Sequence, residues 1–157
     1  MKIKLLTIGK TDSRPLQQLI DEYCKRLGFY IPFSMDIIPD IKNTKNLTTK
    51  QQKIAEGKEL LKKIVKSDAV ILLDENGKLY NSIQFSAFLQ KKMNSGLKKI
   101  VFVIGGPYGF SDDVYNRCNE KISLSPMTFS HQMVRLFFTE QLYRSFTILR
   151  NEPYHHH

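Results

Sequence analysis

The chain has 157 residues, 41% of them hydrophobic and 25% charged, which are ordinary values for one globular domain with a single core. No apolar run approaches the roughly 20 residues that cross a bilayer. Residues 1–8 read as a strand rather than as the apolar core of a signal peptide. We therefore expect a cytoplasmic protein without a membrane partner. Cys24 and Cys118 stand far apart and predict neither a metal site nor a disulfide framework.

The net charge of +9 is concentrated in the amino-terminal half. Residues 1–66 carry 14 Lys and Arg against 7 Asp and Glu, whereas residues 105–157 carry 5 against 5. A basic surface is typical of proteins that bind a polyanion, which suggests nucleic acid. A lysine-rich surface that only keeps the protein soluble has the same composition, so charge alone leaves both interpretations open.

Strand patterns alternate with helical periodicity along the whole chain. The predicted strands are 2–8, 33–38, 69–73, 99–104 and 122–124. The predicted helices are 15–27, 49–66, 83–94, 111–118 and 131–149. This alternation predicts an α/β fold: a single domain over residues 1–157, with a mostly parallel sheet flanked by helices.

Turn and capping residues in the sequence predict where the strands and helices begin and end. Asn76-Gly77 is typical of a tight turn, after which residues 78–80 would pair briefly. Ser82 is the expected cap of the helix that follows. Residues 41–49 are polar and without period, which predicts a mobile loop. The helix at 131–149 is apolar on more than one side, so it is either deeply buried or shared with a second subunit; we favour a symmetric dimer.

The strand at 99–104 begins with Lys99, is apolar from Ile100 to Ile104 and runs into Gly105-Gly106-Pro107-Tyr108-Gly109. Glycines after a buried strand let backbone N–H groups approach a ligand at the carboxyl edge of a sheet. The loop lacks the lysine of a Walker motif and the spacing of a dinucleotide fingerprint. No Ser/His/Asp or Cys/His set is recognisable either, and His131 cannot bind a metal alone. Nucleoside triphosphates, metals and covalent nucleophiles are therefore weakly supported.

Four ordered blocks carry a family resemblance that spans the chain. They are 104–109 (IGGPYG), 124–135 (LSPMTFSHQMVR), 140–144 (EQLYR) and 151–155 (NEPYH). Together with the chain length, these blocks resemble small SPOUT-class methyltransferases that act on large-subunit ribosomal RNA. The resemblance implies a deep trefoil knot in the carboxyl-terminal part, a homodimer, and S-adenosylmethionine as methyl donor, with no metal. It further implies methylation of N3 of a pseudouridine in a hairpin loop of 23S rRNA, on assembled ribosomes.

The resemblance also implies site residues. Contacts to S-adenosylmethionine fall at eight positions: Leu73, Gly105, Leu124, Ser125, Pro126, Met127, Thr128 and Phe129. We expect Arg135 and His155 near the reacting base, with Tyr154 stacking on RNA or bonding to it. His131 is a further candidate catalytic residue. Structural roles remain open for two of these residues. The alternative for His131 is a hydrogen bond at the start of the helix, and the alternative for Arg135 is an ion pair with Glu140 or with a residue of a second subunit.

Three other functions stay open at this point. The first is a SPOUT enzyme for another RNA target, such as a tRNA base or a ribose hydroxyl. The second is a non-catalytic RNA-binding assembly factor, although such a protein would have no reason to keep both the glycine loop and the segment 124–129. The third is a flavodoxin-like small-molecule domain, which the basic amino-terminal half makes less attractive.

Overall fold

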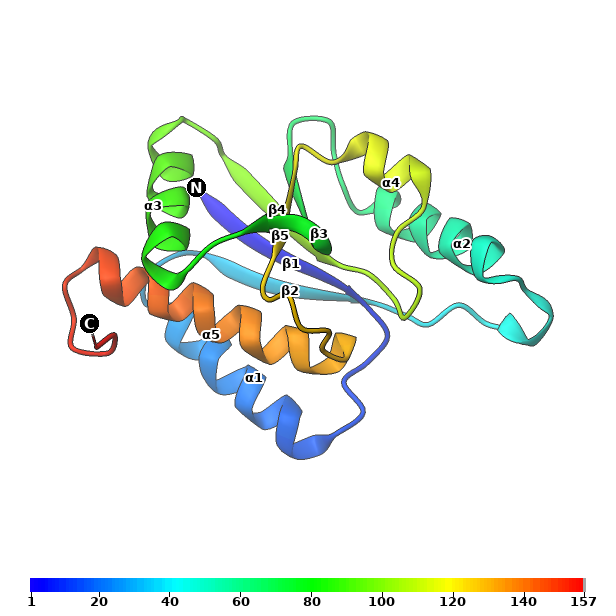
Figure 1. Cartoon of the computed structure of the whole chain (residues 1–157), viewed down its shortest axis with the longest axis horizontal. Coiled ribbons are helices and arrows are strands. Elements are labelled where there is room, and N and C mark those ends of the chain that lie inside the picture. The colour runs from blue at the N-terminus through cyan, green and yellow to red at the C-terminus, as the bar shows by residue number, and fades with distance from the viewer. Residues whose placement is uncertain (157) are drawn as a thin grey trace.

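A five-stranded sheet forms the centre of the protein in a computed structural model, which describes residues 1–156 (Figure 1). The strands are β1 (Lys2–Ile8), β2 (Phe33–Ile38), β3 (Ala69–Leu79), β4 (Lys99–Ile104) and β5 (Glu120–Ser123). The helices are α1 (Arg14–Leu27), the 3₁₀ turn η1 (Thr44–Asn46), α2 (Thr49–Lys62), α3 (Ser82–Asn94), α4 (Asp112–Arg117) and α5 (His131–Leu149). The strand order is β2-β1-β4-β3-β5, and all four pairings are parallel. The α/β prediction is confirmed; His157, which the predicted domain includes, lies outside the described residues.

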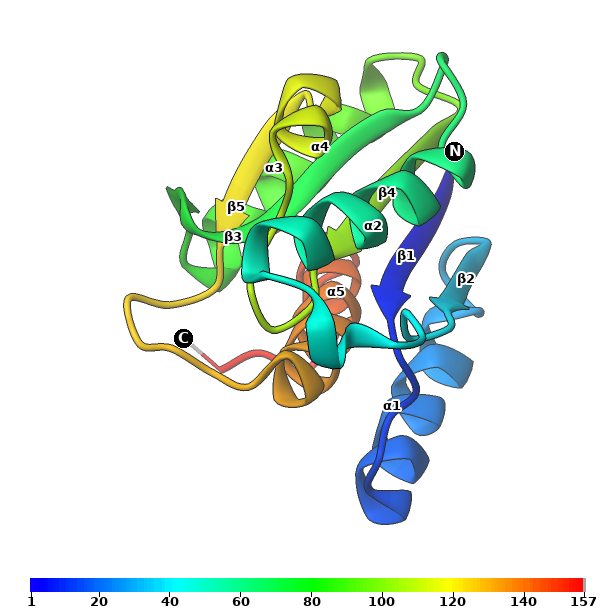
Figure 2. The ribbon, with the colours of Figure 1, turned by 90° about the vertical axis from the view of Figure 1, so that its right-hand side faces the viewer.

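The sheet separates two hydrophobic clusters, one under each helix layer. Strand residues such as Leu5 and Phe102 face α1, α3 and α5, where Phe138 is fully buried. Their neighbours in sequence, such as Leu6 and Val103, face α2 and α4. Both faces of the central strands are therefore covered, which explains their continuous apolar runs. Figures 1 and 2 show the two helix layers on opposite sides of the sheet.

Several predicted ends differ from the structure by a few residues. Asn81, not Ser82, caps α3: its side chain accepts a hydrogen bond from the Gln84 N–H at 2.8 Å, and Gln84 bonds back to it. This reciprocal pair satisfies two amides that the helix start would leave free. Helix α2 ends at Lys62, four residues before the predicted end at Lys66.

The turn predicted at Asn76-Gly77 is wrong. Strand β3 continues to Leu79 and stays parallel to β5, with a register shift between Leu73 and Lys78. Both Leu73 and Lys78 pair with Ile122, so the residues between them bulge out of the ladder. Gly77 is required there, because a Cβ would lie 2.5 Å from the backbone of Ile122. Such bulges are frequent beside functional sites.

Helix α5 packs against α1, α3 and β4. Its buried face includes polar side chains, and the hydroxyl of Thr139 donates to the carbonyl of Arg135 at 2.9 Å. Met133 and Phe137 remain 37% and 38% exposed, so part of the second apolar side faces outward. The dimer stays a prediction. Within residues 1–156, no helix combines the length and apolarity needed to span a membrane.

Candidate functional site

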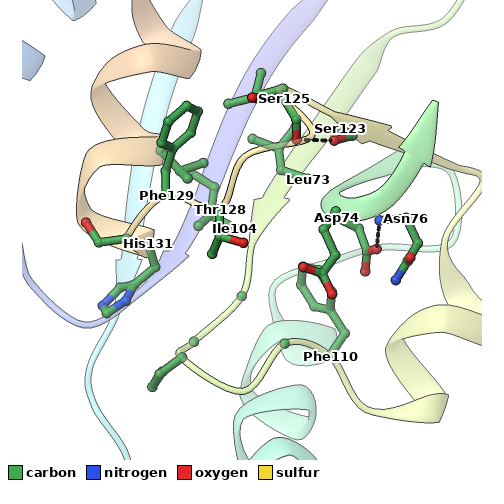
Figure 3. Close-up of a pocket in the computed structure, with 18 of the residues that line it drawn as sticks. Leu73, Asp74, Asn76, Ile104, Phe110, Ser123, Ser125, Thr128, Phe129 and His131 are labelled. Atoms are coloured by element: carbon green, nitrogen blue, oxygen red, sulfur yellow. Dashed lines mark hydrogen bonds between the residues drawn. The ribbon is translucent and has the colours of Figure 1, made fainter. Parts of the chain in front are cut away.

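A cavity of about 560 Å³ lies at the carboxyl edge of the sheet, where the chain leaves β3, β4 and β5 (Figure 3). Its walls come from residues 73–76, 104–110, 122–125 and 127–131, together with Tyr115 of α4 and Val134 of α5. Figure 3 shows His131 on one side of the site and Asp74 on the other. This volume lies within the range of roughly 300–1,000 Å³ that is usual for small-molecule pockets.

The loop after β4 is a tight turn from Gly106 to Gly109. The Gly109 N–H donates to the Gly106 carbonyl at 3.2 Å, and Gly109 has a φ of +82°, which disfavours any side chain. A Cβ on Gly105 would lie 3.1 Å from the ring of Phe110, and one on Gly106 would lie 2.5 Å from Glu56 Oε2. The loop is therefore packed on its outer side, and its backbone faces the cavity.

The bulge in β3 presents a fixed carboxylate to the cavity. The Tyr115 hydroxyl donates to Asp74 Oδ2 at 2.5 Å, and the Asn76 N–H donates to Asp74 Oδ1 at 2.8 Å. Burial and the neighbouring Asp74 raise the pKa of Tyr115, so Tyr115 remains a donor. These two bonds fix the position of the Asp74 side chain at the rim.

The segment from Ser123 to Ser130 forms the wall opposite the glycine turn. Ser123 Oγ donates to the Ser125 carbonyl at 3.0 Å, and Ser125 Oγ accepts from the Met127 N–H at 2.9 Å. These bonds fold an otherwise irregular segment over the cavity. Ser130 then caps α5 by accepting from the Met133 N–H at 3.2 Å.

The charge of this cavity is opposite to that of the whole protein. Its charged lining side chains are Asp74 and Glu75, and no Lys or Arg is among the described residues that line it. A pocket with carboxylates and no cations disfavours phosphates and favours a ligand that carries positive charge.

His131 lies at the start of α5 at the border of this cavity, and its Nε2 lies 3.4 Å from the side-chain nitrogen of Gln132. Burial and the nearby Arg135 guanidinium lower its pKa, although Asp12 and Asp40 oppose the shift. His131 is therefore neutral at pH 7 and can accept a proton.

The cavity brings together seven of the eight residues predicted to contact the methyl donor. They are Leu73, Gly105, Leu124, Ser125, Met127, Thr128 and Phe129. Pro126 is not among the lining residues. Residues as far apart in sequence as Leu73 and Phe129 thus converge on one site.

Comparison with known proteins identifies the family of the chain. Residues 1–155 match the family described as "Predicted SPOUT methyltransferase". The chain belongs to the SPOUT methyltransferases. It is 69% identical to ribosomal RNA large subunit methyltransferase H of Flavobacterium psychrophilum, 67% identical to the protein of that name in Flavobacterium johnsoniae and 64% to that in Christiangramia forsetii. Each alignment covers 99% of both chains, so the resemblance noted from the sequence is confirmed.

A more distant solved structure, assigned to the TrmH family of RNA methyltransferases and from Porphyromonas gingivalis, has 10% identity and a TM-score of 0.41. The match covers 88% of this chain and 58% of that one. At this level the likeness adds nothing to the SPOUT assignment.

Arg135 is fully buried in this SPOUT methyltransferase and is not among the described residues that line the cavity. It donates to the Ile8 carbonyl at 2.6 Å and to Thr11 Oγ1 at 3.2 Å, while its Nε has no partner among the described residues. Burial lowers the pKa of Arg135. The geometry ties α5 to the end of β1, and the expected pair with Glu140 is not formed.

The other two candidates, Tyr154 and His155, pack against the outer side of α5. Tyr154 donates to Glu140 Oε1 at 3.0 Å, and Arg144 bonds the same carboxylate at 2.6 Å. Arg144 also lies 3.3 Å from His155 Nδ1. Neither Tyr154 nor His155 lines the cavity, but Glu140 lines a second groove of about 380 Å³ that shares Ser125 with it.

Sequence reasoning missed three polar residues at the site. Asp74 follows a buried strand directly, a signal that favours a position at the carboxyl edge. Tyr115 and Glu56 gave no signal, because both lie on helices and reach the site only through packing of α2 and α4. Among residues 1–156 no group of three or more His, Cys, Asp or Glu side chains is placed to hold a metal ion.

Proposed function

We propose that this SPOUT methyltransferase transfers the methyl group of S-adenosylmethionine to N3 of a pseudouridine in a hairpin loop of 23S rRNA. The observation that carries the proposal is the convergence of seven predicted donor-binding residues on one cavity at the carboxyl edge of the sheet. The relatives at 64–69% identity are named for the large-subunit ribosomal RNA, which supports the substrate class.

The cavity fits this methyl donor in size and in chemistry. Its apolar wall includes Leu73, Leu124 and Phe129, which suit an adenine ring and a thioether. The glycine turn offers backbone groups at close approach. The carboxylates of Asp74 and Glu75 suit a ligand that is positively charged at its sulfonium and amine. We expect the segment 124–129, Leu73 and Gly105 to hold it.

S-adenosylmethionine supplies a methyl group already activated on a sulfonium, so this chain has to position the nucleophile and manage one proton. N3 of the base forms a bond to the methyl carbon while the carbon–sulfur bond breaks, and the N3 proton must leave. His131, whose pKa is lowered and which borders the cavity, is the group we expect to accept that proton. Alignment of the two reactants supplies on the order of 7–11 kcal/mol in such reactions.

The remaining candidates have less direct roles in the proposal. Arg135 fixes α5 and thereby places His131 one helical turn away. Tyr154 donates to Glu140, which lines the groove next to the donor cavity, and we expect Tyr154 and His155 to contact the RNA there. Burial and hydrogen bonds to Tyr23 and Glu140 raise the pKa of Tyr154, which therefore stays protonated and acts as a hydrogen-bonding group rather than as a base.

The proposal includes a trefoil knot, a homodimer and a cytoplasmic location on assembled ribosomes. Membership of the SPOUT family supports the knot. The exposed apolar side chains of Met127, Met133 and Phe137 beside the cavity support a second subunit. A ribosomal substrate requires the compartment in which ribosomes are found, and a substrate of that size supplies contact surface that a chain of 157 residues lacks.

The test is methyl transfer from labelled S-adenosylmethionine to bacterial ribosomes that lack the modification. The rRNA is digested, and the methylated nucleoside is identified by mass spectrometry. We expect 3-methylpseudouridine from a large-subunit hairpin, and only with assembled ribosomes. Product in tRNA or on a ribose hydroxyl would replace the proposed substrate. The absence of both transfer and donor binding would leave a non-catalytic RNA-binding factor.

A further inference from the structure

Most of the excess positive charge lies in one continuous stretch, residues 41–66. It contains eight lysines and two glutamates, so one-sixth of the chain carries six of the nine net positive charges. Seven of these lysines are exposed: Lys42, Lys45, Lys50, Lys58, Lys62, Lys63 and Lys66. Of the two glutamates, Glu56 is buried. We call the exposed face of residues 41–66 the lysine face.

Contacts within the protein do not explain these lysines. Among residues 1–156, Lys62 is the one member of the set that forms an ion pair, with Glu59 at 2.6 Å. The first turn of α2 carries Lys50 and no acidic residue, although a helix start favours an acid over a base. The charge therefore costs local stability, which points to an external anion as its partner.

The helix that carries most of the lysine face packs behind the glycine turn of the methyl-donor cavity. The inner side of α2 packs directly beneath the site: a Cβ on Gly57 would lie 2.3 Å from Ser111 Oγ, and Glu56 lies against Gly106 of the glycine turn. Residues 39–48 leave β2 at the same edge of the sheet as the cavity. Figure 2 shows this segment and α2 side by side toward the viewer, in front of the sheet.

We propose that the lysine face binds the phosphate backbone of the RNA on one side of the nucleotide that enters the cavity. This inference rests on the proposed function and adds the surface that holds the substrate. The two sites divide the charges: the donor cavity has carboxylates and no described lysine or arginine, whereas the lysine face has at most one paired cation. RNA helices are recognised largely through phosphate and 2′-hydroxyl contacts, which lysines can make without reading sequence.

The test uses the triple variant K42E/K45E/K50E, which reverses the charge of the exposed lysines between the end of β2 and the first turn of α2. Binding to unmethylated bacterial ribosomes is measured at several salt concentrations, together with donor binding by calorimetry. Each phosphate contact contributes about 0.7–0.9 to the slope of log affinity against log salt. We expect the slope to fall by about 2 to 3 and the affinity at low salt to fall by about tenfold or more, with unchanged donor affinity.

Two further variants separate the lysine face from charge in general. K42R/K45R/K50R keeps the charge and should bind ribosomes as the wild type does. K25E/K91E/K98E makes the same change in charge at exposed positions in the last turns of α1 and α3 and just before β4, at the opposite edge of the sheet. It should lose less than about threefold in affinity.

Wild-type affinity and slope in K42E/K45E/K50E would overturn the inference, and so would an equal loss in the control triple. Failure of wild-type protein to bind ribosomes would overturn it as well. If the wild type binds ribosomes but transfers no methyl group, the proposed function fails while the lysine face is still tested by binding.

Discussion

The carboxyl group of Glu56 lies against Gly106, so closely that a Cβ on Gly106 would come within 2.5 Å of Glu56 Oε2. A Gly106→Ala substitution therefore forces the glycine turn toward the cavity. We expect S-adenosylmethionine affinity to fall by about tenfold and the free energy of unfolding to fall by about 1–3 kcal/mol, as for other overpacked sites. Calorimetry and urea denaturation measure the two effects.

The double variant Gly106→Ala/Glu56→Ala is the matched control, because it removes the group that the new methyl would meet. A double-mutant cycle should give a favourable coupling of about 0.5–3 kcal/mol between the two changes. Unchanged donor binding in the single Gly106→Ala variant would show that the turn does not shape the cavity.

Glu56 itself should make stability depend on pH. Burial raises the pKa of its carboxyl, with a smaller contribution from Asp40, and Oε2 has no partner among the described residues. A carboxyl whose pKa is higher in the folded state favours folding below its unfolded pKa, and this contribution is lost as pH rises through the folded value. Glu56→Gln keeps the bond from Gln52 and removes the charge.

We expect Glu56→Gln to be more stable than the wild type at pH 8, with the difference shrinking toward pH 4. Urea denaturation across that range measures it, and Glu59→Gln on the exposed side of the same helix is the control. A variant that is less stable than the wild type at pH 8 would mean that the Glu56 carboxylate has a stabilising partner.

The sequence predicted the framework because apolar periodicity reports burial directly. The strand at 99–104 is apolar from Ile100 to Ile104 because both its faces are covered there, and its glycines follow at the sheet edge where the cavity lies. Ser130 caps α5 and Thr48 caps α2, because each side chain accepts a hydrogen bond from a backbone N–H in the first turn of its helix. The donor-binding residues were predicted from the family resemblance, because no local sequence pattern shows which distant segments meet in the fold.

Local patterns failed where a distant segment decides the structure. Asn76-Gly77 has the composition of a hairpin turn, but pairing of Lys78 with Ile122 of β5 keeps the strand parallel. Arg135 is predicted from the sequence to lie near the reacting base, yet its guanidinium donates to the carbonyl of Ile8, 127 residues away. Glu56 is one of many charges on α2 in the sequence, and only tertiary packing buries it.

Asp74 should discriminate between the donor and its product. S-adenosylmethionine carries a positive sulfonium, whereas S-adenosylhomocysteine has a neutral thioether. If Asp74 acts through its charge, Asp74→Asn should weaken binding of the donor by about three- to tenfold, or roughly 1 kcal/mol, and leave product binding within about twofold. Titration calorimetry with both ligands gives the ratio.

The exposed Asp113, which does not line the cavity, offers the control Asp113→Asn. This variant should bind both ligands as the wild type does. An equal loss of both ligands in Asp74→Asn would assign Asp74 to holding the shape of the bulge with Tyr115 rather than to charge.

Arg135→Ala should act mainly on stability. The side chain is fully buried and donates to the end of β1, so its removal leaves a cavity and unpaired acceptors. We expect the free energy of unfolding to fall by about 2–5 kcal/mol, as for other large-to-small changes in a core. Arg14→Ala, at an exposed position, should stay within about 0.5 kcal/mol of the wild type. An Arg135→Ala protein that unfolds like the wild type but transfers no methyl group would instead place Arg135 at the reacting base.

His131 should set the acid side of the pH dependence of methyl transfer. Its pKa is lowered by burial and by Arg135, so the base form predominates down to a pH below the ordinary histidine value, and activity is lost as pH falls through the folded pKa. His131→Ala should lower kcat by about 10²-fold and remove this acid limb, because a general base contributes on that order. The rate with saturating ribosomes, measured from pH 5 to 9, gives both effects, and the exposed His156→Ala should keep the wild-type profile. An acid limb that persists unchanged in His131→Ala would exclude His131 as the proton acceptor and leave it the role of bonding within the first turn of α5.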